Sequence, residues 1–211
     1  MAEQENSKDL ISVLWSGADI LRSKMDANEY KNYLLGIVFY KYLSDSFLVK
    51  VYDMICDDKP ESLKEALDVY VEELQGEDAD ELIKEMKDEC HYIIEPELTY
   101  TCFADAARNN VFNRELLQKA FNNIEQSDPI FADLFADIDL YSNRLGAGDQ
   151  KQSDTIASLI REIDKADLLN TDAEILGNAY EYLIGQFASE TGKKAGEFYT
   201  CLLYTSDAAD D

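Results

Sequence analysis

Hydrophobic residues recur at intervals of three and four along most of the chain, the spacing that places them on one face of an α-helix. Residues 10–25 predict a first helix, and after a break at residues 26–28 a much longer helix begins near Glu29 and continues to about Ile55. Because the long helix is apolar on most of its sides, we expect it to lie at the centre of the fold. No segment alternates between apolar and polar residues as a half-buried strand does.

Further helices are expected downstream, each marked by an apolar stripe at helical spacing. The stripes consist of Leu63, Leu67, Val71 and Leu74; Leu82, Ile83 and Met86; Leu116, Leu117, Ala120, Phe121 and Ile124; Ile156, Leu159, Ile160 and Ile163; and Ile175, Leu176, Ala179, Leu183 and Phe187. The pattern therefore predicts a mainly α fold.

The segments between these helices carry weaker signals. Residues 97–103 are expected to form a short extended piece, and Asn109-Asn110 has the chemistry of a turn. Ser127-Asp128-Pro129 predicts a helix start, because Asp is a favoured N-cap and proline is tolerated in the first turn. Residues 141–152 contain Gly146-Ala147-Gly148 and are the clearest loop.

The net charge of the chain argues against some functional classes, direct nucleic-acid binding above all. The 211 residues include 44 Asp or Glu against 19 Lys or Arg, a net charge of −25. A protein that grips nucleic acid by itself usually presents a basic face, so any DNA contact is expected to need a partner. About half of the excess acid lies in residues 51–100, where it occupies the polar side of the two helical stripes. It is either a solvated face or a patch that docks a basic partner.

Other sequence features suggest a cytoplasmic protein without a membrane segment. No run approaches the roughly 18 apolar residues of a membrane span, and the N-terminus has no secretory signal pattern. Cys56, Cys90, Cys102 and Cys201 form no C-x-x-C pair, so we expect free thiols and neither disulfides nor a metal site. His91 directly follows Cys90, and neighbours on a helix diverge, so a catalytic Cys-His pair is not expected.

Three sequence blocks carry a family resemblance. Residues 14–22 read LWSGADILR, residues 29–45 run from EYK to KYLSD, and residues 176–200 run from LGNAYEYLIGQFA to KAGEFYT. In this order they resemble the N-terminal part of the modification (M) subunit of type I restriction-modification systems, an adenine-N6 DNA methyltransferase. The last block is the most specific, since family members typically read G-x-x-YE-x-L-I-x-x-F-A and then K-x-G-x-FYTP.

The resemblance implies an architecture, a cofactor and partners. Residues 1–150 would form a helical N-terminal domain, and residues 151–200 would form connecting helices and the start of a Rossmann-like α/β methyltransferase domain that is otherwise absent here. The implied cofactor is S-adenosylmethionine, which Glu197, Phe198, Tyr199 and Thr200 would contact. The implied partners are a specificity (S) subunit, a second M subunit and a restriction (R) subunit, with DNA bound through the complex.

The family's catalytic residues have no counterpart in this chain. The family flips its target base against an Asn-Pro-Pro-aromatic motif, but Pro60, Pro96 and Pro129 are the chain's three prolines and none is adjacent to another. No glycine-rich loop follows a strand either. We therefore assign no catalytic residue and expect the chain by itself to be inactive.

Residues 201–211 depart from the family pattern. Where the family continues with proline and a basic residue, this chain reads CLLYTSDAADD, which looks like the in-frame translation of a transposon-end sequencing adaptor. We interpret residues 201–211 as a non-native tail on an N-terminal fragment. An alternative from another functional class is a stand-alone acidic interaction protein, such as a DNA mimic.

Overall fold

The computed structural model describes residues 2–167 together with residues 177, 181 and 185. Residues 2–167 contain helices and no strand, which confirms the mainly α prediction. In chain order the elements are α1 (Ala2–Arg22), α2 (Ala27–Cys56), α3 (Leu63–Glu73), α4 (Ala79–Cys90), the 3-10 turn η1 (Pro96–Leu98), α5 (Tyr100–Arg108), α6 (Arg114–Ser127), the 3-10 turn η2 (Pro129–Phe131) and α7 (Asp149–Ile163).

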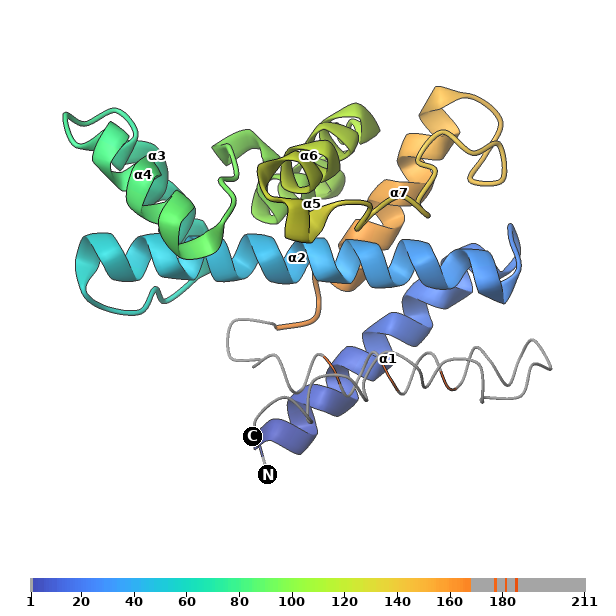
Figure 1. The fold of residues 1–211 in the computed structure, drawn as a ribbon. Coiled ribbons are helices and arrows are strands. Elements are labelled where there is room, and N and C mark those ends of the chain that lie inside the picture. The colour runs from blue at the N-terminus through green and yellow to red at the C-terminus, as the bar shows by residue number, and fades with distance from the viewer. Residues whose placement is uncertain (1, 168–176, 178–180, 182–184, 186–211) are drawn as a thin grey trace, which may run out of the picture.

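Helix α2 is the central element of the fold. Its 30 residues span about 45 Å, and Figure 1 shows α3 to α6 arranged along one side of it while α1 runs off the other side. The helix begins at Ala27, slightly earlier than expected, because the Asp26 carboxylate caps it by accepting from the backbone N–H groups of Asn28 and Glu29 at 3.0 and 3.2 Å. It ends at Cys56, where Asp57 adopts a left-handed conformation.

Gly17 on α1 and Gly36 on α2 allow neighbouring segments to pack closely against these two helices. A Cβ at Gly17 of α1 would lie 2.8 Å from Leu34 Cδ2 of α2 and 3.1 Å from Leu159 Cδ1 of α7. A Cβ at Gly36 of α2 would overlap Ile138 Cδ1, which belongs to the segment between η2 and α7. The absence of a side chain at these positions lets α1 meet both α2 and α7, and lets the segment around Ile138 cross directly over α2.

The expectation of an extended piece at residues 97–103 is wrong. The structure instead has the 3-10 turn η1 followed by helix α5. Thr99 decides the outcome, because its backbone is extended while its Oγ1 accepts from the Cys102 N–H, as in a helix N-cap. The helix then buries Tyr100, Phe103, Ala104 and Ala107 on one face.

Asp128 also acts as a cap, as predicted. Its carboxylate accepts from the Ile130 N–H at 2.9 Å, and Pro129 follows in the first turn. The element it starts is only η2, three residues long. The predicted turn at Asn109-Asn110 is present, with Asn110 in the left-handed region at φ 56°.

The acidic helices α3 and α4 are amphipathic. They bury Ala66, Leu67, Tyr70, Leu82, Met86 and Cys90. Ile83, expected on the apolar stripe, is 37% exposed instead. The acids occupy the remaining surface of these helices, which agrees with a solvated face.

Three cysteines and the histidine lie in the described part of the chain. Cys56, Cys90 and Cys102 are free thiols, and Cys201 lies outside the described residues. His91 ends α4 in a left-handed conformation, and its Nδ1 lies 3.6 Å from Asp128 Oδ2. The described part of the chain holds no cluster of potential metal ligands. It also contains no helix with the length and apolar character needed to cross a membrane.

Candidate functional site

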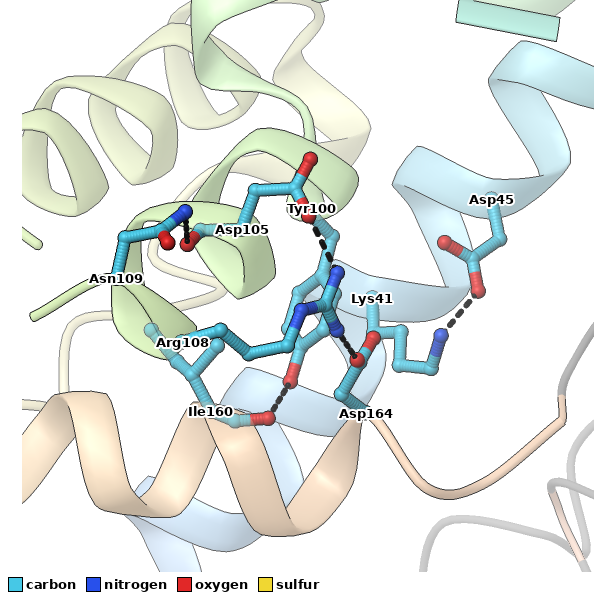
Figure 2. Close-up of polar contacts among 8 residues, drawn as sticks. All are labelled: Lys41, Asp45, Tyr100, Asp105, Arg108, Asn109, Ile160 and Asp164. Carbon is cyan, nitrogen blue, oxygen red and sulfur yellow. Dashed lines mark hydrogen bonds and ion pairs between the residues drawn. The ribbon is translucent and has the colours of Figure 1, made fainter. Parts of the chain in front are cut away.

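The residues predicted to contact a cofactor lie outside the described part of the chain. These residues are Glu197, Phe198, Tyr199 and Thr200. The tail at residues 201–211 lies outside the described part as well, and so does the helix expected from the stripe between Ile175 and Phe187, apart from the single residues 177, 181 and 185. Within residues 2–167, the most distinctive group of charged side chains lies where α2, α5 and α7 meet (Figure 2).

A buried ion pair lies at the centre of this group. Lys41 Nζ is 2.6 Å from Asp45 Oδ2, and the two side chains are only 3% and 2% exposed. They lie one turn apart on α2, which is buried by its neighbours along most of its length. The sequence pattern does not single out this pair, although two opposite charges four residues apart in an otherwise apolar helix are a signal that could have found it.

Tyr100 connects the ion pair to α7. The Lys41 ammonium lies 5.0 Å from the centre of the Tyr100 ring, a cation–π contact. The Tyr100 hydroxyl donates to the Ile160 carbonyl of α7 at 2.9 Å, and its backbone N–H donates to Ser44 Oγ of α2 at 2.8 Å. Burial raises the pKa of Tyr100 well above its usual value, so the hydroxyl stays protonated and remains a donor.

Charged residues of α5 hold the end of α7 from outside. Arg108 at the end of α5 forms ion pairs with Asp105 of the same helix and with Asp164, the residue that follows α7 (Figure 2). Asn109 closes the end of α5 by donating from Nδ2 to the Asp105 carbonyl at 2.9 Å. The last turn of α7 is therefore attached to α5 by the Arg108–Asp164 ion pair, by the buried hydrogen bond from Tyr100 to Ile160, and by Arg161, whose guanidinium donates to the Ala107 carbonyl at 2.5 Å.

The electrostatics of the group centre on Asp45. Burial raises its pKa from 3.8 to about 6, and Lys41 opposes that shift, whereas the negative charges of Asp164 and Asp167 add to it. Asp45 Oδ1 is buried and has no hydrogen-bond partner. Asp45 is therefore the carboxyl of this group whose pKa is shifted toward neutral pH.

A second buried cation fixes the loop before α7. The Arg114 guanidinium, at the start of α6, pairs with Asp149 Oδ1 at 2.6 Å and donates to Gln152 Oε1. It also stacks over the Tyr141 ring at 4.5 Å. These contacts hold both ends of the loop against α6, which is a structural role. The loop spans residues 141–148 and not the predicted 141–152, because α7 begins at Asp149.

With the fold in place, the chain can be compared with known proteins. The model of the HsdM N-terminal domain matches residues 10–163, from within α1 to the last residue of α7. The chain belongs to the HsdM N-terminal domain family. A second model, N-6 DNA Methylase, matches residues 171–202. The first match thus ends at the last residue of α7, and the Lys41–Asp45 pair lies beside that helix end.

Relatives of this HsdM N-terminal domain are subunits of one kind of enzyme. The chain is 27% identical to the type I restriction enzyme MpnII methylase subunit of Mycoplasma pneumoniae, over 94% of this chain and 38% of the relative. It is 31% identical to the MjaVIII methylase subunit of Methanocaldococcus jannaschii, over 92% of this chain and 30% of the relative. The chain therefore spans about a third of the length of these relatives.

A solved structure resembles the fold closely. It is the crystal structure of the type I restriction-modification system methyltransferase subunit from Streptococcus thermophilus, which matches with a TM-score of 0.83 and 48% identity. The match covers 89% of this chain and 40% of that one. The arrangement of helices described above is therefore that of the corresponding part of a methyltransferase subunit.

Proposed function

We propose that the chain is the N-terminal part of the M subunit of a type I restriction-modification complex, whose intact form methylates adenine N6 in DNA. The order of the two family matches supports this most strongly, because a helical HsdM N-terminal domain is followed at once by a segment similar to N-6 DNA methylases. S-adenosylmethionine would supply the methyl group. The proposed division is a helical domain over residues 1–150, connecting helices and the start of the methyltransferase domain over residues 151–200, and a non-native tail.

The proposed cofactor contacts rest on the family pattern. Glu197, Phe198, Tyr199 and Thr200 lie inside the segment that matches the N-6 DNA methylase model. Glycine at position 196 would allow the backbone there to approach a small ligand closely.

The helical domain is proposed to act through protein partners. A net charge of −25 opposes direct binding to phosphates, so the expected contacts are with an S subunit, a second M subunit and an R subunit in the cytoplasm, with DNA reached through the complex. The acidic faces of α3 and α4 are better suited to such contacts or to water than to DNA.

Sequencing the source DNA across codon 200 tests this proposal, using long reads without a transposon-based library. The expected frame continues from Thr200 into proline and a basic residue, then a glycine-rich loop, and later an Asn-Pro-Pro-aromatic motif. A stop codon directly after the present residue 211 in the genomic DNA would contradict the proposal. It would favour a stand-alone acidic interaction protein instead.

A further inference from the structure

Asp45 has an oxygen atom that the fold leaves without a partner. Its Oδ2 accepts from Lys41, but its Oδ1 is buried and accepts no hydrogen bond. A buried carboxylate oxygen without a donor is expensive when the group is ionised, because the water that would solvate it has been removed. The cost falls when the carboxyl is protonated, so this position favours the neutral form.

The charged groups around Asp45 experience a different electrostatic field when its carboxyl is protonated. Lys41 lies on the same helix, α2. From α5, the Tyr100 ring lies over Lys41, and Arg108 forms an ion pair with Asp164. Asp164 and Asp167, which follow α7, are the two nearby carboxylates that raise the pKa of Asp45. When Asp45 is ionised, it neutralises Lys41 and repels the two carboxylates near the end of α7. When Asp45 is protonated, the Lys41 charge is uncompensated on α2.

That uncompensated charge acts on α7. The C-terminus of a helix is its negative end, and Asp164 adds a carboxylate there, which Arg108 of α5 pairs. Arg161 in the same turn is engaged by the Ala107 carbonyl of α5. A net positive charge on α2 therefore attracts the last turn of α7, where the ionised pair exerts no net attraction. Tyr100 links Lys41 directly to α7. Its ring contacts Lys41, and its hydroxyl donates to the Ile160 carbonyl in that same last turn.

We propose that Lys41, Asp45 and Tyr100 form a proton-operated latch, which tightens the last turn of α7 against α2 and α5 when Asp45 is protonated and loosens it when Asp45 is ionised. The pKa of Asp45, raised by burial to about 6, places this change within the pH range of ordinary solution work. The latch is a property of the helical domain alone. A consequence for the orientation of the methyltransferase region after α7 rests on the function proposed above.

Hydrogen exchange of the 211-residue chain at pH 5.0 and 7.5 tests the latch, with protection factors corrected for the intrinsic pH dependence of exchange. Protection of the amides of residues 160–166 is expected to rise roughly tenfold at pH 5.0 relative to the buried amides of α6, the scale of one charge acting over about 12 Å at an effective dielectric near 20. Asp45→Asn removes the titrating group, so protection in that turn should be equal at the two pH values.

Asp68→Asn is the matched control. Asp68 accepts from Lys64 four residues earlier on α3, in the same spacing as the buried pair, but its side chain is 62% exposed. This variant should keep the wild-type pH response at residues 160–166. An equal pH response in Asp45→Asn and Asp68→Asn would overturn the proposal.

Carboxyl NMR titration of the wild type decides the question even where Asp45→Asn fails to fold. A midpoint for Asp45 near 6 that the amide shifts of residues 160–166 follow supports the latch. A midpoint near the ordinary value of about 4, or amide shifts there that do not titrate with Asp45, overturns it. Both measurements concern only the helical domain, so their failure would leave the proposed methyltransferase function untouched. Conversely, a stop codon after residue 211 would contradict that function and leave the latch in place.

Discussion

The substitution Lys41→Met should be strongly destabilising at neutral pH. It removes the partner of a carboxylate whose side chain is 2% exposed, and breaking a buried pair in this way typically costs about 3–5 kcal/mol. That is a large fraction of the roughly 5–15 kcal/mol that stabilises an ordinary domain. The cost arises mainly because Asp45 stays buried with neither a counter-charge nor a donor.

The loss of stability caused by Lys41→Met should be smaller at acidic pH. Asp45 in the wild type has a pKa of about 6 in the fold against 3.8 as its ordinary value, so ionising it in the fold costs about 3 kcal/mol at 1.36 kcal/mol per unit. The raised pKa of Asp45 stabilises the folded state. This stabilisation is fully present below pH 3.8 and is lost as the pH rises through 6. For wild-type Asp45 about 1.4 kcal/mol of the change falls between pH 5.0 and 7.5. Without Lys41 the pKa rises further, so Lys41→Met should be less damaging at pH 5.0.

Urea denaturation followed by circular dichroism, at pH 5.0 and 7.5, measures these free energies of unfolding. The double variant Lys41→Met/Asp45→Leu buries no charge and should lie within about 1.5 kcal/mol of the wild type. The exposed pair Lys64–Asp68 on α3 provides the control, because Lys64→Met should change stability by less than about 0.5 kcal/mol. The reasoning is refuted if Lys41→Met costs no more than Lys64→Met, or costs the same at both pH values.

Three further predictions concern packing around the same framework. Gly36→Ala should destabilise by about 1–3 kcal/mol through its overlap with Ile138 Cδ1, and Ile138→Val in the same chain should recover most of that loss in thermal unfolding; additive effects would contradict the contact. Arg114→Met should leave Asp149 unpaired and speed protease cleavage in residues 141–148, while Lys151→Met should not; equal cleavage rates would argue against the role of Arg114. Tyr100→Phe removes the hydrogen bond to Ile160 and should cost about 1 kcal/mol in urea denaturation, whereas the exposed Tyr141→Phe should be neutral; equal losses would show that the bond contributes nothing.

Local sequence signals predict most of the helices. The apolar stripes place α3, α4, α6 and α7, because a repeat of three and four residues is a property of the helix itself. Asp26 and Asp128 act as caps through their own neighbours, so sequence reasoning finds them. The misplaced element is α5, where the β-branched and aromatic residues of 97–103 favour an extended segment and the Thr99 cap decides otherwise.

The charged group beside α7 could not be predicted in the same way. Lys41 and Asp45 are close in sequence, but their burial depends on the neighbours that cover α2, and the groups that shift the Asp45 pKa include Asp164, far along the chain. The pairing of Arg114 with Asp149 likewise depends on how the loop before α7 folds back. Such contacts between distant segments leave no periodic trace in a single sequence.

Methyl transfer measured on the full-length subunit is the most direct measurement of the central claim. The subunit encoded at the source locus would be assembled with its S subunit and assayed with tritium-labelled S-adenosylmethionine, with and without residues 10–163. We predict label at adenine N6 for the complete subunit and a loss of most of the activity when the helical domain is removed. The claim would be contradicted if adenine were not labelled, or if removing residues 10–163 left the rate unchanged.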